Sequence, residues 1–310
     1  MALSKTTHFL ITGATGFVGA NMAHRLAREG YKHIHILARG AFGNWRIRGI
    51  EKKLHIHRAD IAAANAVRKA VNSAKPDIIF HFANIGIYGG KESPDEAYMR
   101  VNFFGLVNLL EALARVPYKL FVNTGSSSEY GTKRRAMSEG DVCSPESMYG
   151  VTKLMATEYA SFSAKTQKKP IITLRLFSPF GPFDDHRRLV SQAIVRLMRG
   201  KELRLGNPRA VRDYIHVDDI VDLYLEAARR AREMPQGGVF NVGRGREVAA
   251  GDVVEKITHV LAPEKRLKWG TYRSHGIESA VWRADMRKTF RQFIWRPRVD
   301  IEKGIQETIE

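Results

Sequence analysis

A glycine loop with the spacing G-x-x-G-x-x-G, made by Gly13, Gly16 and Gly19, constrains the fold of this chain most strongly. The loop follows the apolar run His8–Thr12 and opens a helical pattern at Val18–Glu29. In such a position the first glycine permits a tight turn, the second lets the backbone approach a pyrophosphate, and the third permits close helix–strand packing. The N-terminus of the helix then faces the phosphates. The loop therefore predicts a first strand–helix unit that binds a dinucleotide.

The same alternation of apolar runs and helical patterns continues over the first 180 residues. Because nearly every residue of these runs is apolar, we expect a parallel sheet whose two faces are both covered by helices. The other expected strands are His33–Leu37, Leu54–His57, Asp77–Phe82, Lys119–Asn123 and Ile171–Phe177. The other expected helices are Ala64–Ser73, Pro94–Arg115 and Ser147–Thr166, and Gly30 is expected to end the first helix. Residues 1–180 thus predict an α/β fold of the Rossmann type, a doubly wound parallel sheet that binds NAD(P).

Beyond Gly181, apolar runs and helical patterns alternate less regularly. Asp218 or Asp219 is expected to cap a helix that runs to Arg232. The other elements expected here are helices at Arg188–Arg199, Gly251–Leu261, Asp285–Phe290 and Asp300–Ile309 and a strand at Gly238–Val242. We expect residues 181–310 to form mainly a smaller C-terminal α/β lobe that binds the substrate, with segments at about 208–242 and 281–294 returning to the larger domain.

Composition narrows the class of protein. No stretch approaches the roughly 20 apolar residues that span a bilayer, and the first residues lack the pattern of a signal peptide. The single cysteine, Cys143, cannot form an internal disulfide, which fits a cytoplasmic protein without a membrane partner. The net charge of +18 is spread over helices and turns and not gathered in an arm. We therefore expect no nucleic-acid partner and a basic surface that attracts an anionic diphosphate substrate.

Tyr149 and Lys153 lie four residues apart, on one face of the expected helix Ser147–Thr166. A cation within a few ångströms favours the phenolate, and lowering the tyrosine pKa by roughly three units would make Tyr149 a useful base near neutral pH. Such a pair is also common on ordinary helix surfaces. The glycine loop upstream favours the catalytic interpretation, in which Tyr149 moves a proton while a nicotinamide cofactor carries the hydride.

A hydroxyl-rich turn, Thr124–Gly131, follows the expected fifth strand. Hydroxyl groups at the carboxyl end of a parallel strand lie in the crevice where ligands bind and can donate hydrogen bonds to a substrate oxygen. Ser126, Ser127 and Ser128 are candidates for that role, and Glu129 is a candidate for an additional acid or base. The alternative is a serine-rich turn that only ends the strand.

Arg39, near the end of the second expected strand, bears on the choice of cofactor. NAD-binding sites usually carry an acidic residue there for the ribose hydroxyls, whereas a guanidinium suits a 2′-phosphate. NADP(H) is therefore favoured, although an exposed surface arginine is compatible with either cofactor. Asp60 is expected to contact adenine, unless it caps the segment after Ile61.

Four histidines, His33, His35, His55 and His57, alternate along two expected neighbouring strands. No carboxylate or cysteine pattern accompanies them, and catalytic metal sites need an open cavity. We therefore expect exposed or packed histidines and no metal.

Taken together, the motifs resemble those of the extended short-chain dehydrogenases/reductases, in the nucleotide-sugar epimerase/dehydratase family. The resemblance runs over essentially the whole chain. Its carriers are Thr12–Gly19, Phe80–Ala83, Tyr149–Lys153, Leu174–Pro182, Arg212–Asp219 and Phe240–Gly243.

This resemblance implies that Tyr149 is the catalytic acid/base and that Lys153 is its partner, which also holds the nicotinamide ribose. One of Ser126, Ser127 or Ser128 would match the catalytic Ser/Thr of the family. The run Ser127–Glu129 is similar to the Thr-Ser-Glu of nucleotide-sugar 4,6-dehydratases, in which the Glu removes a proton beside the keto group.

The resemblance also implies contacts with the cofactor and the substrate. Besides Tyr149 and Lys153, the implied cofactor residues are Gly13, Thr15, Gly16, Phe17, Val18, Gly19, Arg39, Asp60, Ile61, Phe82, Ala83, Asn102, Thr124, Phe177 and Pro179. The implied substrate residues are Ser128, Ser178, Arg212 and Arg273. Ser178 stands where most relatives have Asn against a substrate phosphate, Arg212 matches the arginine that clamps the diphosphate, and Arg273 is a second such arginine.

Two functions from different classes follow. The first is an NAD(P)-dependent enzyme that moves a hydride to or from a sugar carbon of a nucleoside-diphosphate sugar, as an epimerase, a 4-keto reductase or a dehydratase. The expected carbon is C4. The second is a redox-silent NAD(P)-binding scaffold or sensor. The intact Tyr149 and Lys153 favour the enzyme. The resemblance further implies a homodimer formed through the helices Pro94–Arg115 and Ser147–Thr166.

Overall fold

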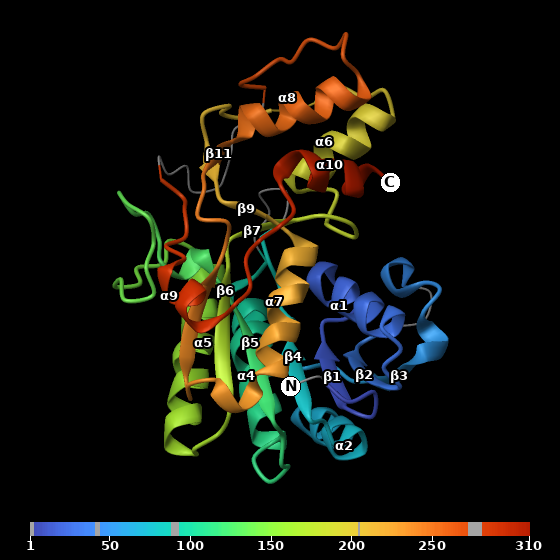
Figure 1. Ribbon diagram of the computed structural model, residues 1–310, viewed down its shortest axis with the longest axis vertical. Helices are drawn as coiled ribbons and strands as arrows, with labels where there is room; N and C mark the ends of the chain where they lie inside the picture. The colour runs from blue at the N-terminus through green and yellow to red at the C-terminus, as the bar shows by residue number, and fades with distance from the viewer. Residues whose placement is uncertain (1–2, 41–43, 88–92, 204, 272–280) are drawn as a thin grey trace.

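The computed structural model describes residues 3–40, 44–87, 93–203, 205–271 and 281–310. Seven parallel strands form the central sheet in the order β10-β6-β5-β4-β1-β2-β3 (Figure 1). They are β1 (His8–Thr12), β2 (His33–Ala38), β3 (Leu54–Arg58), β4 (Ile78–His81), β5 (Leu120–Ser126), β6 (Ile171–Leu176) and β10 (Gly238–Val242). The strand order reverses between β1 and β4, which is where sheets of this type bind their ligands. The expected doubly wound parallel sheet is confirmed.

Helices cover both faces of this sheet. One face is covered by α1 (Phe17–Arg28) and α7 (Val217–Arg229), which lie side by side, and the other by α2 (Ala64–Ala74), α4 (Phe104–Ala112) and α5 (Met148–Thr166) (Figure 1). Alternate strand residues enter the two apolar layers, so that Phe9 and Ile11 face α1 and α7 while Leu10 faces the opposite layer. Burial on both sides explains why the strands are apolar on nearly every residue.

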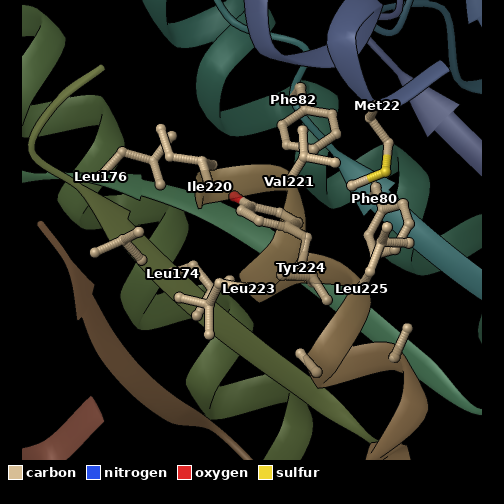
Figure 2. Packing of buried hydrophobic residues seen from close by; sticks show 14 of the residues in the cluster. Met22, Phe80, Phe82, Leu174, Leu176, Ile220, Val221, Leu223, Tyr224 and Leu225 are labelled. Carbon is tan, nitrogen blue, oxygen red and sulfur yellow. The ribbon is translucent and has the colours of Figure 1, made fainter. Parts of the chain in front are cut away.

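Tyr224 of α7 lies at the centre of the first apolar layer (Figure 2). Its ring centroid is 4.9 Å from that of Phe82 and 5.8 Å from that of Phe80. The buried hydroxyl of Tyr224 has a partner in the Thr124 hydroxyl, at 2.7 Å. Helix α7 is thereby fixed against the carboxyl end of β5, which borders the site described below.

The expected single helix Pro94–Arg115 is instead three consecutive elements. They are α3 (Asp95–Tyr98), a π-helical turn η3 (Met99–Phe103) and α4. The wider π turn places Asn102 against the chain that follows β4, where its side-chain amide bonds both backbone groups of Ile85, at 2.7 and 3.0 Å. Such turns are frequent near functional sites, and no periodic pattern in the sequence distinguishes them from a regular helix.

A second group of elements lies beyond the sheet. Helices α6 (Leu189–Met198), α8 (Ala250–Leu261) and α10 (Ile301–Ile309) gather at one end of the molecule and share a buried apolar cluster (Figure 1). Two small sheets pair β7 (Ser178–Phe180) with β9 (Tyr214–His216) and β8 (Val211–Arg212) with β11 (Val248–Ala249). The remaining short elements are α9 (Arg287–Gln292), η1 (Trp45–Ile47), η2 (Glu51–Lys53), η4 (Ser127–Glu129) and η5 (Ala231–Glu233). No helix among the described residues is long and apolar enough to span a membrane.

The start of α7 differs from the expectation of an aspartate cap. The cap is His216, whose Nδ1 accepts the Asp218 backbone N–H at 3.4 Å. The carboxylate of Asp219 instead accepts the backbone N–H groups of Arg298 and Val299, at 2.8 and 3.1 Å. Asp219 therefore ties the chain that leads into α10 to the first turn of α7. The helix ends at Arg229, before the position expected from sequence.

Candidate functional site

A cavity of about 670 Å³ lies at the carboxyl ends of the parallel strands. Nearly all of the site residues expected from sequence line it. These are Gly13, Thr15, Gly16, Phe17, Val18, Gly19, Arg39, Asp60, Ile61, Phe82, Ala83, Thr124, Ser126, Ser127, Ser128, Tyr149, Lys153, Phe177, Ser178, Pro179 and Arg212. Glu129 and Asn102 are not among the lining residues, and Arg273 lies outside the described residues.

The glycine loop forms a close cradle at one end of the cavity. Gly13 has φ +72°, a conformation that favours glycine, and a Cβ there would lie 2.7 Å from the Ala83 backbone nitrogen. A Cβ on Gly19 would lie 2.3 Å from the Gly13 carbonyl oxygen, so α1 packs directly on the loop. Gly16 is the N-cap of α1 and donates its N–H to Gly13, at 2.9 Å. The first turn of α1 thus presents backbone N–H groups to the cavity, as pyrophosphate binding requires.

Arg39 and Asp60 border the part of the cavity formed at the ends of β2 and β3. Arg39 is exposed. One carboxylate oxygen of Asp60 accepts the Ala62 backbone N–H at 2.9 Å, which fixes the turn before α2. The helix begins later, with Ala63 as its N-cap. Asp60 therefore orders this turn while also lining the cavity.

The first turn of α5 positions Tyr149 and Lys153. Ser147 is the N-cap, and its hydroxyl accepts the Gly150 N–H at 3.1 Å. A Cβ on Gly150 would lie 2.5 Å from the Ser128 carbonyl oxygen, so the serine turn and the start of α5 are in direct contact. This contact fixes the start of α5 against the serine turn, and Tyr149 lines the same cavity as Ser126, Ser127 and Ser128.

Lys153 is almost fully buried, with 3% of its surface exposed. Burial lowers the pKa of its ammonium to about 8, although the Glu129 carboxylate acts in the opposite direction. The ammonium is therefore predominantly charged at neutral pH and lies in a medium of low dielectric constant, where its effect on a neighbouring phenol is strong.

The three serines of the turn differ in their surroundings. The Ser126 hydroxyl accepts the Ser128 N–H at 3.2 Å and so keeps its own hydrogen for a further acceptor. The Ser127 hydroxyl accepts the indole N–H of Trp282 at 3.1 Å. Ser126 and Ser127 are buried and Ser128 is partly exposed, and all three border the cavity.

Glu129 does not take the place expected of an acid or base that faces substrate. Its side chain is fully buried, and its Oε2 accepts from the Arg175 Nε at 2.6 Å. Its Oε1 accepts the Ser126 backbone N–H at 2.7 Å, which closes a capping box on η4. Burial raises the pKa of Glu129, and Arg175 and the Ser126 N–H oppose that shift. Glu129 therefore stabilises the serine turn from behind the cavity wall, where Arg175 of β6 is its buried partner.

Asn102 is a second residue placed behind the cavity wall. Besides its two bonds to Ile85, its amide nitrogen donates to the Thr152 hydroxyl at 3.2 Å. These bonds occupy both the oxygen and the amide group of Asn102. Asn102 thus links the chain after β4 to α5 and positions the cavity wall. The sequence predicted that Asn102 would contact the cofactor, but it is not among the residues that line the cavity.

The other end of the cavity is built by β7, β8 and a segment near the C-terminus. The Arg212 guanidinium lies over the Trp282 ring, 5.0 Å from its centroid, and one of its nitrogens donates to the Val211 carbonyl at 2.7 Å. Ser178 borders the same region and is anchored through its backbone N–H, which donates to the Asp213 carbonyl at 3.0 Å. The cation–π contact with Trp282 holds the Arg212 guanidinium at the edge of the cavity.

Sequence reasoning missed two residues of this region. No sequence motif surrounds Trp282, so nothing marked it as a partner of Ser127 and Arg212. Arg188 also lines the cavity, and it forms an ion pair with the nearly buried Asp184 at 3.0 Å. The Asp-Asp-His-Arg-Arg run that contains both residues is a signal that could have marked Arg188.

Curated relatives cover nearly the whole chain. The chain is 27% identical to UDP-glucose 4-epimerase of Mycolicibacterium smegmatis, over 97% of each protein. It is 26% identical to probable UDP-arabinose 4-epimerase 3 of Arabidopsis thaliana, over 98% of this chain and 79% of that protein. A crystal structure of UDP-glucuronic acid 4-epimerase from Bacillus cereus, solved with UDP-glucuronic acid and NAD, shares the fold. Its TM-score is 0.87 at 24% identity, over 98% of each chain.

The family model described as the NAD dependent epimerase/dehydratase family matches residues 9–243, which contain the glycine loop, the serine turn and the Tyr149–Lys153 pair. The chain therefore belongs to the NAD-dependent epimerase/dehydratase family.

Proposed function

We propose that this chain is an NAD(P)-dependent 4-epimerase of a nucleoside-diphosphate sugar. The observation that carries the proposal is one cavity lined by the glycine cradle, the serine turn, Tyr149 and the buried Lys153. The relatives named as UDP-sugar 4-epimerases support the same reaction class.

The glycine cradle fits a dinucleotide, because Gly13 and Gly19 leave room for the loop, the chain after β4 and the start of α1 to pack closely. The N-terminus of α1 then faces the cavity, where a pyrophosphate can bind. A bound NAD(P)⁺ supplies the hydride acceptor and, later in the cycle, the hydride donor. Lys153 holds the nicotinamide ribose and keeps the Tyr149 phenol acidic.

Tyr149 acts as the proton carrier in this proposal. It accepts the proton of the sugar C4 hydroxyl while the C4–H bond breaks, which leaves a ketone at C4. It returns the proton to that oxygen when hydride is added to the opposite face of the ketone. The Ser126 hydroxyl donates a hydrogen bond to the same oxygen and stabilises the charge that develops on it.

The place of Glu129 favours an epimerase over a dehydratase. A dehydratase needs an additional base beside the keto group, and the Glu129 carboxylate is held by Arg175 and the Ser126 N–H behind the cavity wall. We propose that Arg212, stacked on Trp282, clamps the substrate diphosphate with the smaller lobe around it. Arg273 is proposed as a second contact from the residues outside the described ranges.

Replacing Tyr149 with phenylalanine tests the proposal. We expect turnover of UDP-glucose or of UDP-glucuronic acid to fall by about 10²–10⁴-fold, because the proton carrier is lost. Binding of the dinucleotide, followed by nicotinamide fluorescence, should stay within about twofold, since the glycine cradle is unchanged. Full turnover by Tyr149→Phe would contradict the mechanism, and no turnover of any nucleotide sugar by the wild type would favour the redox-silent scaffold.

We propose that Arg39 gives the chain a preference for NADP(H) over NAD(H). Its guanidinium is exposed at the end of β2, where it can pair with a 2′-phosphate. The variant Arg39→Ala should weaken NADP⁺ binding by roughly tenfold or more, the size of one charge-assisted hydrogen bond. Binding of NAD⁺, which lacks the phosphate, is the internal control. Equal affinities for both cofactors in the wild type would contradict the preference.

We also propose a homodimer formed through α4 and α5. Phe104 of α4 is 50% exposed and Phe162 of α5 is 62% exposed. The Phe103 ring links the two helices, since it contacts Phe104 of α4 at 5.2 Å and Tyr159 of α5 at 5.9 Å between centroids. Exposed apolar surface of this kind is typical of an interface. Light scattering should give twice the chain mass for the wild type and the single chain mass for Phe162→Glu.

A further inference from the structure

Five histidines lie together on one face of the sheet, toward the edge formed by β3. His33 and His35 of β2 lie between His8 of β1 and His55 and His57 of β3. All five share the face whose apolar layer contains Leu10 and Leu37. The rings form a stack, with centroids 4.2 Å apart for His8 and His33 and 4.7 Å apart for His35 and His55. None of the five lines the cavity.

The sequence pattern had indicated only the four histidines of two strands, and the structure adds His8 to them. It is the first residue of β1 and pairs in register with His33, the first residue of β2. One ring nitrogen each from His8, His33 and His35 can be chosen so that the three atoms lie within 4.8 Å of one another. The parallel register of β1 and β2 therefore creates a group of three imidazoles that neither strand has alone.

The second ring nitrogens are oriented by the protein. His8 Nδ1 lies 3.1 Å from the Ala74 carbonyl oxygen, to which it donates, so its Nε2 carries the free lone pair. His35 Nδ1 lies 3.0 Å from His57 Nε2. Metal-binding histidines usually fix their second nitrogen in this way, with a hydrogen bond to a carbonyl or another acceptor.

The Nε2 atom of His35 is buried and has no hydrogen-bond partner among the described residues. The residue as a whole is 7% exposed. When His35 donates from Nδ1 to His57, its Nε2 is a buried lone pair without a donor, which costs free energy. A cation bound at this nitrogen would remove the cost.

Neutral imidazole is the form of histidine that coordinates a metal ion. His8 and His33 are partly exposed, so an ion can reach the group from solvent.

We propose that His8, His33 and His35 bind one divalent first-row transition ion, of the zinc, nickel or copper type. Three neutral imidazoles are typical ligands of these ions, and water completes the coordination. Tetrahedral bonds of about 2.0–2.1 Å need nitrogens about 3.3 Å apart, so the stacked rings must turn about their side-chain torsions to direct their lone pairs at one ion. The bound ion joins β1 to β2 on a face away from the cavity, independently of the proposed epimerase.

Binding of zinc alone to protein without an affinity tag tests this site. After treatment with a chelator, calorimetry with ZnCl₂ and native mass spectrometry should give one ion per chain. The melting temperature should rise with zinc concentration, because the ion binds the folded state. His33→Gln should weaken zinc binding by at least about tenfold. Circular dichroism of each variant shows that its fold is retained.

The matched control is His259→Gln, which removes an exposed histidine on α8. It should bind zinc like the wild type, and so should Tyr149→Phe, because neither residue belongs to the histidine group. The proposal is overturned if neither zinc nor copper binds stoichiometrically. It is equally overturned if His33→Gln binds zinc like the wild type, or if His259→Gln weakens binding as much as His33→Gln does.

Discussion

Two regions of the molecule hold their buried polar groups differently. Behind the cavity, the Glu129 carboxylate has two partners within 2.7 Å, and Asp213 accepts three backbone N–H groups. In the histidine group on the face of α2, His35 Nε2 has no partner among the described residues. In the first region these carboxylates have their partners without a ligand, and the region holds the cavity wall in place. In the second region, the proposed ion would supply the partner that His35 Nε2 lacks.

The largest predicted effect comes from breaking the ion pair behind the cavity. Arg175→Met leaves the buried Glu129 carboxylate without its cation and should lower the free energy of unfolding by about 3–5 kcal/mol in urea titrations. Adding Glu129→Gln to this variant should restore part of the loss, since no buried charge remains. A loss below about 1 kcal/mol in the single variant would show that this region does not depend on the pair.

The buried Lys153 predicts a smaller effect that depends on pH. Its pKa is about 8 in the folded chain and near its ordinary value of 10.5 in the unfolded chain. Between these values the unfolded chain binds the extra proton, so raising the pH favours the folded state. The stability of the wild type relative to Lys153→Met should therefore be constant below pH 8. Above it, the difference should rise by at most about 1.4 kcal/mol per pH unit.

Urea titrations of both proteins at several pH values measure this difference. A second variant, Lys165→Met near the C-terminal end of α5, is the control, because this lysine is exposed. A difference between wild type and Lys153→Met that is flat over the whole range would contradict the buried ammonium.

The smallest effect is expected at the histidine group. In metal-free protein, His35→Phe removes a buried ring nitrogen that lacks a partner, together with the bond to His57, and leaves an apolar ring of similar shape. The free energy of unfolding should change by less than about 1 kcal/mol, or increase. The same variant should lose the rise in melting temperature that zinc gives the wild type. A loss of stability comparable to that of Arg175→Met would mean that the histidines are a completed network like the one behind the cavity.

Local signals predicted most of the fold and much of the cavity. Strand β1 and strand β10 have the expected bounds, and the glycine loop and Tyr149 lie in the expected turns, because each depends on a few neighbouring residues. Glu129 was misplaced because its partner, Arg175, lies 46 residues away on β6. Asn102 was misplaced because a π turn has no periodic signature.

Two other contacts join residues that lie far apart in the sequence, and no local pattern in a single sequence indicates them. Trp282 reaches Ser127 across 155 residues of chain. His8 joins His33 only through the parallel register of β1 and β2. Contacts of this kind follow from topology and not from local pattern, which is why the histidines on two strands gave no indication of a third ligand.

Turnover of UDP-glucose and UDP-glucuronic acid in deuterated water tests the central claim most directly. A 4-epimerase returns to C4 the hydride that it removed, so product analysed by mass spectrometry and NMR should be the C4 epimer without carbon-bound deuterium. Deuterium on the sugar carbons, or a product that has lost water, would contradict the proposal. Either result would show that a base other than Tyr149 acts beside the keto group.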